Sequence, residues 1–558
     1  MGSNDDRPPD VAPDDSAEAM AKRGEWAAAY RALAEGDRGG ALNGAGLERL
    51  GEAAYMLGRE TEFVEAFERA FDDHRRNGLI LRAARCAFWI GLTLIFRGEC
   101  GRGSGWLRKS DRLLDGHDSD CAEHGYLMLP KVEQCLASGD FEGAYEHAAR
   151  AAEIGERHDD EDLLCIARHL QGRIMIESGD QSSGLALLDE AMVAVTANQL
   201  SPIVTGLIYC SVIEACQKFY AINRAREWTA ALTGWCSKQP EIVAFTGRCL
   251  IHRAQILIYD GHWIEAEREA VAATIRLKQG PAEHYAGPAL YQEGEVHRLR
   301  GRFDKADDAY RAASRLGFDP QPGLALMRLE QGRGQSALSA IRRALHSAEG
   351  AASKLRLLPA AVEITLAAGS TEDARAYCDM LRGLAAQYSA ESVRASVDEA
   401  LAQIRMADGL TEDALACVRR AADRLRDLQA PYHLARLRLL TARVYLAIGD
   451  VEGAQTELEA ALGVFHDLGA RPDETRTSKM LARLTKSGDT ALTSRQAQVL
   501  QLIADGMTNP AIADSLGLSE RTVDRHVSNI LTRLNVPTRA AATAYALSHG
   551  LIDTGRAG

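Results

Sequence analysis

The chain has 558 residues, more than a single hydrophobic core normally serves, so several domains or a repeat array are expected. Its formal charge of −13 excludes a molecule that binds nucleic acid through a uniformly basic surface, but a small DNA-binding module remains compatible with it. No apolar run reaches the roughly 18 residues that a membrane-spanning helix needs, so we expect a cytoplasmic protein without a membrane partner.

The first 16 residues are acidic and rich in proline, which predicts a disordered N-terminus over residues 1–16. They lack the basic and apolar regions of a secretory signal. The 11 cysteines include no CxxC pair and lie mostly in helical patterns. Buried, reduced thiols are therefore the favoured interpretation, with a redox sensor as the alternative.

A glycine followed five residues later by an alanine recurs along most of the chain. From Gly58 to Gly301 the copies are 40 or 41 residues apart, counting Tyr220, which takes the place of a glycine. The clearest copies begin at Gly24, Gly139, Gly261, Gly301, Gly332, Gly369, Gly409 and Gly449, and weaker ones at Gly58, Gly98 and Gly179. A period of this length is typical of stacked helical hairpins.

Each copy has a simple physical interpretation. The glycine ends one amphipathic helix in a left-handed conformation, and the alanine allows the next helix to approach the first closely. One hairpin cannot bury its apolar face alone, whereas stacked hairpins can. The pattern resembles the tetratricopeptide (TPR) class, although its period exceeds the usual length of about 34 and most signature tryptophans and prolines are absent. We therefore predict a TPR-like α-solenoid over residues 17–470.

A solenoid offers a long concave surface to a small molecule, a peptide or a protein segment. A passive spacer or an oligomerisation arm is the alternative. After residue 470 the composition becomes charged and the repeat pattern stops, so residues 471–490 are predicted to be a linker with a possible short helix.

Capping and turn residues divide residues 491–553 into four short helices. Gly506 ends the first, Thr508 caps the second, Gly517 supplies a tight turn, Ser519 caps the third and Thr538 caps the fourth. The Leu-Gly-Leu-Ser turn between the second and third helices is typical of a helix-turn-helix, in which the third helix enters the major groove of DNA.

The third helix is amphipathic. Val523, Val527, Ile530 and Leu534 recur at helical spacing and are expected to be buried. The opposite face then holds Arg521, Asp524, Arg525, Ser528 and Thr532.

The segments "LTSRQAQVL", "IADGMTNPAIADSLGLSERTVDRHVSNIL" and "RLNVPTRAAA" closely resemble the C-terminal DNA-binding domain of LuxR-type bacterial transcriptional regulators. The resemblance covers about 60 residues. It implies a helical, dimerising domain that docks its third helix in the major groove. Together with the solenoid expected from the repeats, the predicted fold is all-α: a TPR-like α-solenoid followed by a small four-helix LuxR-type domain. It also implies a transcription regulator that binds double-stranded DNA as a homodimer, with RNA polymerase as a further candidate partner.

By position, the resemblance implies that Asp524, Arg525 and Ser528 face base edges. The residues implied to contact phosphates are Ser519, Arg521, Thr522, Arg533, Arg539 and Asn509. The sequence departs from the family at Gln496 and Gln498, where a glutamate pair is usual. It also departs at Asp524 and Arg533, where lysine is frequent.

Asp524 is the departure that matters most, because a carboxylate repels phosphate. It could accept a hydrogen bond from cytosine N4 beside a guanine contact of Arg525. It could instead be a solvated acid near the positive end of the helix, or it could orient Arg521 or Arg525. Residues 492–552 hold five arginines and four acids, so the domain has a formal charge of only +1. We expect weak binding by a monomer and reliance on a dimer.

Motifs of enzymes and of cofactor sites are absent from the sequence. It lacks GxxxxGK[ST], HExxH, GxSxG and clustered metal-ligand spacings, so neither catalysis nor a cofactor is predicted. We favour a sequence-specific transcription regulator whose solenoid senses a ligand, peptide or protein. The alternative is a protein-binding scaffold whose C-terminal helices serve dimerisation.

Overall fold

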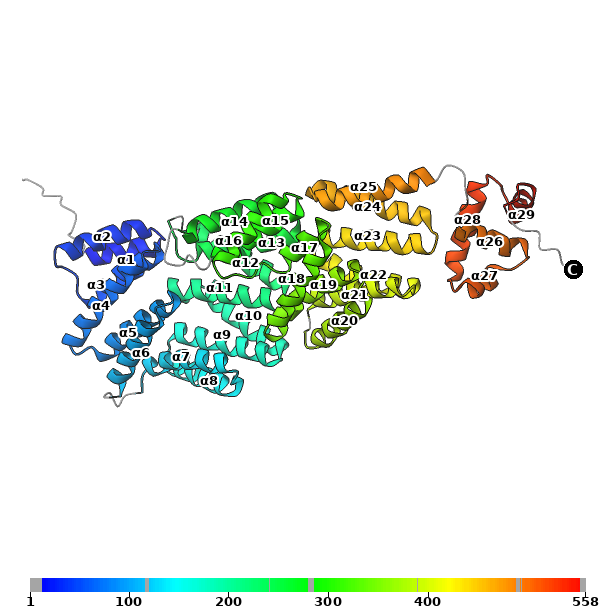
Figure 1. Cartoon of the computed structure of the whole chain (residues 1–558). Helices are drawn as coiled ribbons and strands as arrows, with labels where there is room; N and C mark the ends of the chain where they lie inside the picture. Colours follow the sequence, from blue (N-terminus) through cyan, green and yellow to red (C-terminus); the bar gives the residue numbers. More distant parts are fainter. Residues whose placement is uncertain are drawn as a thin grey trace, which may run out of the picture.

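The computed structural model describes residues 13–115, 120–239, 241–278, 286–388, 390–487, 492 and 494–551. Over these residues every regular element is an α-helix. Figure 1 shows a long stack of paired helices followed by a group of short helices at the C-terminal end. None of the described helices is both long and apolar enough to cross a membrane. The predicted all-α architecture is confirmed.

The helices of the first half are α1 (Pro13–Lys22), α2 (Trp26–Arg38), α3 (Gly44–Met56), α4 (Glu60–Arg76), α5 (Ile80–Phe96), α6 (Cys100–Leu114), α7 (Ala122–Ser138), α8 (Phe141–Arg157), α9 (Glu161–Ser178), α10 (Gln181–Thr196), α11 (Pro202–Lys218), α12 (Ile222–Ser237), α13 (Thr246–Asp260) and α14 (Trp263–Lys278). Those of the second half are α15 (Ala286–Leu299), α16 (Phe303–Arg315), α17 (Gly323–Glu330), α18 (Gly334–Ser347), α19 (Gly350–Ala367), α20 (Thr371–Ala385), α21 (Glu391–Ala407), α22 (Thr411–Asp427), α23 (Pro431–Ala447), α24 (Val451–Leu468), α25 (Arg471–Ser487), α26 (Ser494–Ala504), α27 (Asn509–Leu516), α28 (Glu520–Arg533) and α29 (Arg539–Ser548).

The predicted glycines lie at the turns inside the hairpins. All of them have positive φ, between +72° at Gly58 and +112° at Gly179. Tyr220 occupies the same place with φ of +61°, although a tyrosine has no special freedom there. The left-handed turn is therefore a property of the repeat, and the residue type at the turn can vary.

The alanines five residues after these turns are fully buried. Ala144, Ala266 and Ala414 each have no exposed surface, and the weaker copies carry a buried Phe63, Gly103 or Gly184 at that place. Small side chains at the contact allow the two helices of a hairpin to pack closely. The sequence prediction of a TPR-like solenoid is thus confirmed by both the turns and the contacts.

Two distant parts of the solenoid meet at the segment before α13. The backbone amides of Val243 and Ala244 donate to the carbonyl of Met56 at the end of α3, over 2.9 and 3.1 Å. The indole of Trp26 donates to Gln239 over 2.7 Å. The stack is therefore bridged between its first helices and α13.

The prediction for residues 471–490 needs a correction. Residues 471–487 form the 17-residue helix α25, which packs on α24 and belongs to the solenoid. Asp473 accepts a hydrogen bond from the Tyr432 hydroxyl over 2.9 Å, and Thr477 is fully buried. Met480, Leu481 and Leu484 of α25 pack against a buried cluster that includes Leu439 and Leu458, so the helix joins the hydrophobic core although its sequence is highly charged.

The predicted N-terminal boundary also shifts. Helix α1 begins at Pro13, inside the segment predicted to be disordered, and residues 1–12 lie outside the described residues. Ala17 of this helix is buried in the first hydrophobic cluster of the solenoid.

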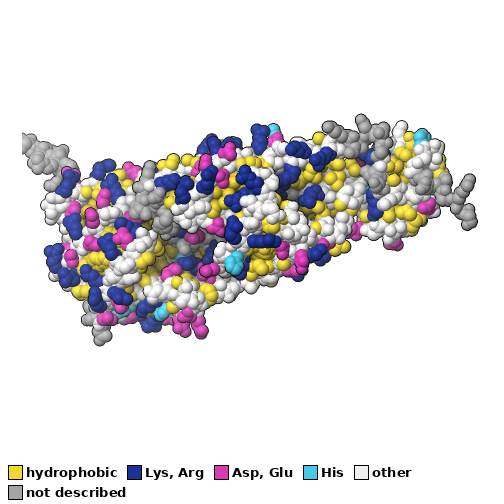
Figure 2. All heavy atoms as spheres, viewed as in Figure 1, with side chains coloured by type: hydrophobic (Ala, Val, Ile, Leu, Met, Phe, Trp, Pro, Cys, Tyr) yellow, Lys and Arg dark blue, Asp and Glu magenta, His cyan; other side chains and the backbone are white. Residues whose placement is uncertain are grey.

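Acidic and basic side chains are interspersed over the face drawn in Figure 2. Over the C-terminal helices this face shows few lysine or arginine side chains. On this face the C-terminal helices therefore agree with the low formal charge counted from the sequence.

Candidate nucleic-acid interface

Helices α26 to α29 enclose a small hydrophobic core of their own. Its buried members are Val499, Leu500, Ile503, Ile512, Ala513, Val523, Ile530, Ala542 and Ala546. Val499, Leu500 and Ile503 come from α26, and Ile512 and Ala513 come from α27. The core holds the last three helices in a fixed arrangement, which a DNA-binding surface requires.

The turn before α28 is built as the sequence predicts. Gly517 closes α27 in the left-handed conformation, with φ of +64°. Ser519 then caps α28, because its hydroxyl accepts a hydrogen bond from the amide of Thr522 over 3.2 Å. The first turn of α28 is therefore fixed relative to α27, and we call α28 the recognition helix.

One face of the recognition helix is buried and the other is exposed. Val523 and Ile530 are fully buried, while Val527 and Leu534 are only half-buried. His526 is 1% exposed, and sequence reasoning missed this position although it lies three residues after Val523 and four before Ile530. The five residues predicted for the opposite face, Arg521, Asp524, Arg525, Ser528 and Thr532, are all exposed.

Burial explains the electrostatics of His526. It lowers the pKa of the imidazole, and the positive charges of Arg495 and Arg525 lower the pKa further. The side chain is therefore neutral near pH 7 and acts as part of the packed face.

Asp524 belongs to a polar chain across two helices. The Asn509 amide donates to the Asp524 carboxylate, and Arg539 donates to Asn509 Oδ1 and to the Met507 carbonyl. Asp524 is thus oriented by Asn509 at the start of α27, and it is not paired with Arg521 or Arg525. Three predicted site residues that are far apart in the sequence lie together here.

Arg533 is also positioned by a neighbour. Its guanidinium donates to Gln496 over 2.9 Å, and Gln496 is 2% exposed. A neutral amide at position 496 orients Arg533 without neutralising its charge. The departure from the family's acidic residue therefore gives Arg533 a neutral partner at position 496.

Arg525 faces the solenoid. Its guanidinium is paired with the Asp450 carboxylate at the start of α24, and it lies over the ring of Tyr445 at 4.8 Å. Sequence reasoning could not find this contact, because the two residues are 75 positions apart and nothing in the pattern pairs them.

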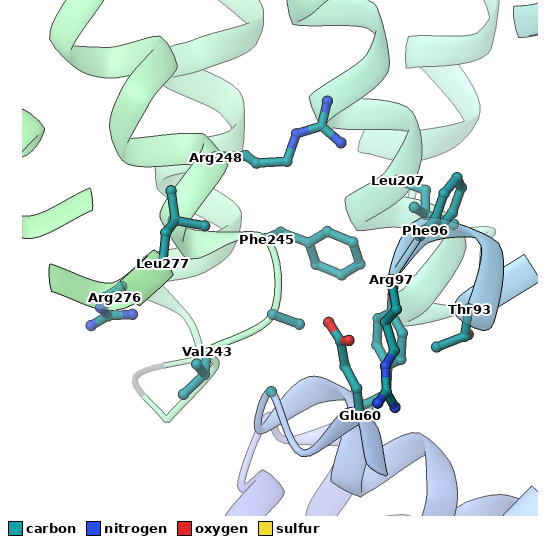
Figure 3. Close-up of a pocket in the computed structure, with 14 residues that line it drawn as sticks. Glu60, Thr93, Phe96, Arg97, Leu207, Val243, Phe245, Arg248, Arg276 and Leu277 are labelled. Atoms are coloured by element: carbon teal, nitrogen blue, oxygen red, sulfur yellow. The ribbon is translucent and has the colours of Figure 1, made fainter. Parts of the chain in front are cut away.

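A second candidate site is a cavity of about 210 Å³ between α3–α5 and α11–α14. Figure 3 shows the Glu60 side chain extending into it toward the ring of Phe245, with Arg97 alongside. Burial raises the pKa of the Glu60 carboxyl, and Arg97 partly opposes this. Phe245 itself has φ of +64°, an unusual conformation for a bulky residue. The cavity combines aromatic walls with one acid, Glu60, and three arginines, Arg97, Arg248 and Arg276.

One group of side chains has the donors of a metal site. His74 Nε2 lies 2.6 Å from Glu48 Oε1, and the Cys86 thiol donates to the same oxygen over 3.5 Å. Burial and the Glu48 charge raise the pKa of the thiol, so it stays protonated near pH 7. His74 Nε2 and the Cys86 thiol both bond to Glu48 Oε1, and we assign no metal to this group.

Known proteins match the C-terminal part of the chain. Residues 490–546 match the family model described as bacterial regulatory proteins, luxR family. The transcriptional regulatory protein LiaR of Bacillus subtilis is 40% identical over 80 residues, covering 13% of this chain and 38% of that protein. The response regulator protein VraR of Staphylococcus aureus (strain NCTC 8325 / PS 47) is 42% identical over 77 residues, covering 13% and 37%. The chain thus spans less than two-fifths of the length of these relatives.

Solved structures match the helical repeats. A Rap protein in complex with competence and sporulation factor has a TM-score of 0.44 at 15% identity, covering 60% of this chain and 99% of that one. The Cut9–Hcn1 hetero-tetramer of APC/C has a TM-score of 0.36 at 13% identity, covering 83% and 95%. With its capped recognition helix and its family match, the segment 490–546 is a helix-turn-helix domain of the luxR family of bacterial regulatory proteins.

Proposed function

We propose that the protein is a sequence-specific, DNA-binding transcription regulator whose helical repeats sense a ligand, a peptide or a protein partner in the bacterial cytoplasm. The observation that supports it best is the recognition helix. It is capped by Ser519, packed through Val523 and Ile530, and polar on its exposed face. A helix presented in this way fits the major groove.

In this proposal three side chains contact base edges. Arg525 donates to guanine O6 and N7, Asp524 accepts from cytosine N4, and Ser528 adds a further polar contact. The link from Asn509 supports the role of Asp524, because it holds the carboxylate at the exposed surface of the recognition helix.

The remaining predicted residues contact phosphates in the proposal. Ser519 and Thr522 lie in the first turn of α28, where the positive end of the helix dipole attracts a phosphate. Arg521 lies beside them, and Arg533 and Arg539 are oriented by Gln496 and Asn509. These contacts position the domain on DNA without specifying sequence.

A homodimer follows from the low charge of the domain. Few cations mean few released counterions, so one domain gains little affinity from electrostatics. Two copies on a two-part site add their contacts. RNA polymerase is a further partner in this proposal, since a regulator on DNA acts on transcription.

The experiment is a footprint on the DNA upstream of the protein's own gene. We expect Arg525→Ala with Ser528→Ala to weaken specific binding at least tenfold, since each base contact contributes about 1–3 kcal/mol. The matched control is Arg108→Ala with Ser104→Ala, which are exposed residues on α6 far from the C-terminal domain. Normal specific binding by the Arg525→Ala, Ser528→Ala variant would contradict the proposed recognition face.

The cavity near Glu60 is the proposed place for a small effector. A ligand there would contact both the first helices and α13, and so could alter how these two parts of the solenoid pack against each other. In a thermal-shift screen, a ligand of this cavity should shift the wild type and lose its effect in Glu60→Gln. Glu65→Gln, an exposed neighbour on α4, should behave like the wild type.

A protein-binding scaffold is the second candidate function. The contact of Arg525 with Asp450 favours it, because it gives the C-terminal helices a protein partner within this chain. Deletion of residues 488–558 separates the two functions. If regulation and partner binding both survive the deletion, the DNA-binding function is wrong.

A further inference from the structure

The cavity near Glu60 has one wall that is fixed from several sides. Phe245 in this wall has φ of +64°, and a bulky residue keeps such a strained conformation only where its surroundings enforce it. Its ring lies against Tyr55 of α3 and Trp235 of α12, with ring centres 5.8 and 6.5 Å away. A methyl group added at Gly206 of α11 would lie 2.2 Å from the same ring. The aromatic wall is therefore in place before any ligand binds.

Two of the three arginines in this cavity already have acidic partners. Arg97 is paired with Glu99 over 3.0 Å, and Arg248 is paired with Glu214. Neither of these two acids lines the cavity. Figure 3 shows the Arg97 guanidinium beside the base of the Glu60 side chain, while the Glu60 carboxyl group extends away from it. The charges of these two arginines are therefore balanced from outside the cavity.

Glu60 differs from these arginines in its contacts. Within the described parts of the chain, its carboxyl group makes neither an ion pair nor a hydrogen bond, whereas Glu62 in the same helical turn is paired with Arg59 over 3.4 Å. Figure 3 shows the carboxyl group pointing into the cavity, toward the ring of Phe245. Burial raises its pKa more than the charge of Arg97 lowers it. The ionised form of this carboxyl group therefore lacks a compensating partner.

An ammonium group would complete these contacts. A carboxylate surrounded by protein is stabilised by a partner that carries the opposite charge and donates a hydrogen bond. The face of an aromatic ring adds a further attraction for an ammonium ion. The third arginine of the cavity, Arg276, is exposed at its edge and would favour an anion instead. The charge of the ligand is therefore the property that an experiment must vary.

We propose that the cavity binds a small primary amine with an apolar or aromatic body. The ammonium group donates to the Glu60 carboxylate and lies against the ring of Phe245, and the body of the ligand fills the space beside Phe96 and Leu207. Ligand pockets usually enclose about 300–1,000 Å³, so a cavity of about 210 Å³ admits only a small molecule. This inference rests on the proposed function, in which the cavity receives a small effector, and it adds the chemical class of that effector.

Three probes of similar shape and different charge test the proposal: 2-phenylethylamine, 2-phenylethanol and phenylacetate. In calorimetric titrations of the full-length protein at pH 7 without DNA, we expect the amine to bind about tenfold more tightly than the alcohol or phenylacetate. Glu60→Gln should remove this preference, because glutamine keeps the shape of the side chain and loses its charge. The matched control is Glu161→Gln, since Glu161 is an exposed acid that begins α9 as Glu60 begins α4. Its preference for the amine should equal that of the wild type.

Phe245→Leu is a second variant, which tests the aromatic wall. Leucine is apolar but has no ring face, so the preference for the amine over the alcohol should fall by about threefold. Thermal unfolding shows whether this variant is folded.

The outcomes separate this inference from the proposed function. Absence of amine binding to the wild type, equal binding of the three probes, or tightest binding by phenylacetate would each contradict an amine site. These results would leave DNA binding by the C-terminal domain standing, because the titrations contain no DNA. Amine binding that depends on Glu60 but leaves the footprint on upstream DNA unchanged would support the amine site and contradict its role in sensing.

Discussion

The solenoid and the C-terminal domain contain the same helix-ending turns and helix caps, but these features have different roles in the two regions. In both, a left-handed residue ends a helix and a small polar side chain caps the next, as at Gly139 and Asp140 or at Gly517 and Ser519. In the solenoid these devices set one hairpin against the next, and each hairpin depends on its neighbours for its buried surface. In the C-terminal domain they place one helix at the surface of a separate hydrophobic core. A cap therefore indicates where a helix begins, while the packing of its buried face determines which face remains exposed for binding.

The largest expected effect concerns the close contact inside a hairpin. Ala144→Phe should destabilise the solenoid by about 3 kcal/mol, because a ring has no space where Ala144 is fully buried between α7 and α8. Ala230→Phe on the exposed side of α12 is the control and should change little. Chemical denaturation measures both. Equal stability of the two variants would contradict the close-approach role of the repeat alanines.

Acid should weaken the solenoid through His169. Burial, with a small contribution from Arg173, lowers the pKa of His169 to about 3. The folded protein therefore favours the neutral ring, and the stability it contributes above pH 6.5 is lost as the pH falls toward 3. On this basis the free energy of unfolding should fall by on the order of 2 kcal/mol between pH 7 and pH 5 for this group alone.

His169→Leu tests that contribution. His169 Nε2 has no hydrogen-bond partner, so replacement by leucine loses no hydrogen bond at that atom. The difference in unfolding free energy between pH 7 and pH 5 should be smaller in this variant than in the wild type. His252, with a pKa of about 3, and His433, with one of about 4, should retain the rest of the acid sensitivity. An unchanged pH dependence would show that His169 titrates normally.

The C-terminal domain is tested by Asp524→Ala. Removing an acid near phosphate should raise affinity for unrelated DNA, while loss of a cytosine contact should reduce the preference for the specific site by about tenfold. Competition between specific and shuffled duplexes measures this preference. Asp514→Ala, an exposed acid on α27, is the control. A uniform loss of binding to all DNA would contradict base recognition by Asp524.

The smallest expected change in stability comes from glycine substitutions at one left-handed turn in each region. Gln429 in the solenoid and Asn535 after the recognition helix both have positive φ, at +52° and +51°. Asparagine tolerates this conformation better than glutamine, so Gln429→Gly should stabilise by up to about 1 kcal/mol and Asn535→Gly by less. Thermal unfolding checks the order. Greater stabilisation by Asn535→Gly would show that other contacts dominate these turns.

Much of the fold could be predicted because its determinants are local. The turn glycines, the alanines that follow them and the cap at Ser519 all act within a few residues of the chain. Residues 471–490 were predicted as a linker with a possible short helix because the segment is highly charged. In the structure Met480, Leu481 and Leu484 of α25 nevertheless pack on the solenoid. His526 was missed because histidine is usually polar, although its helical position placed it inside. The pairing of Arg525 with Asp450 depends on how two domains meet, which no local pattern contains.

Asp450 is both the cap of α24 and the partner of Arg525. One carboxylate therefore serves the start of a repeat helix and a contact with α28, so a single substitution at this position should affect both parts of the chain.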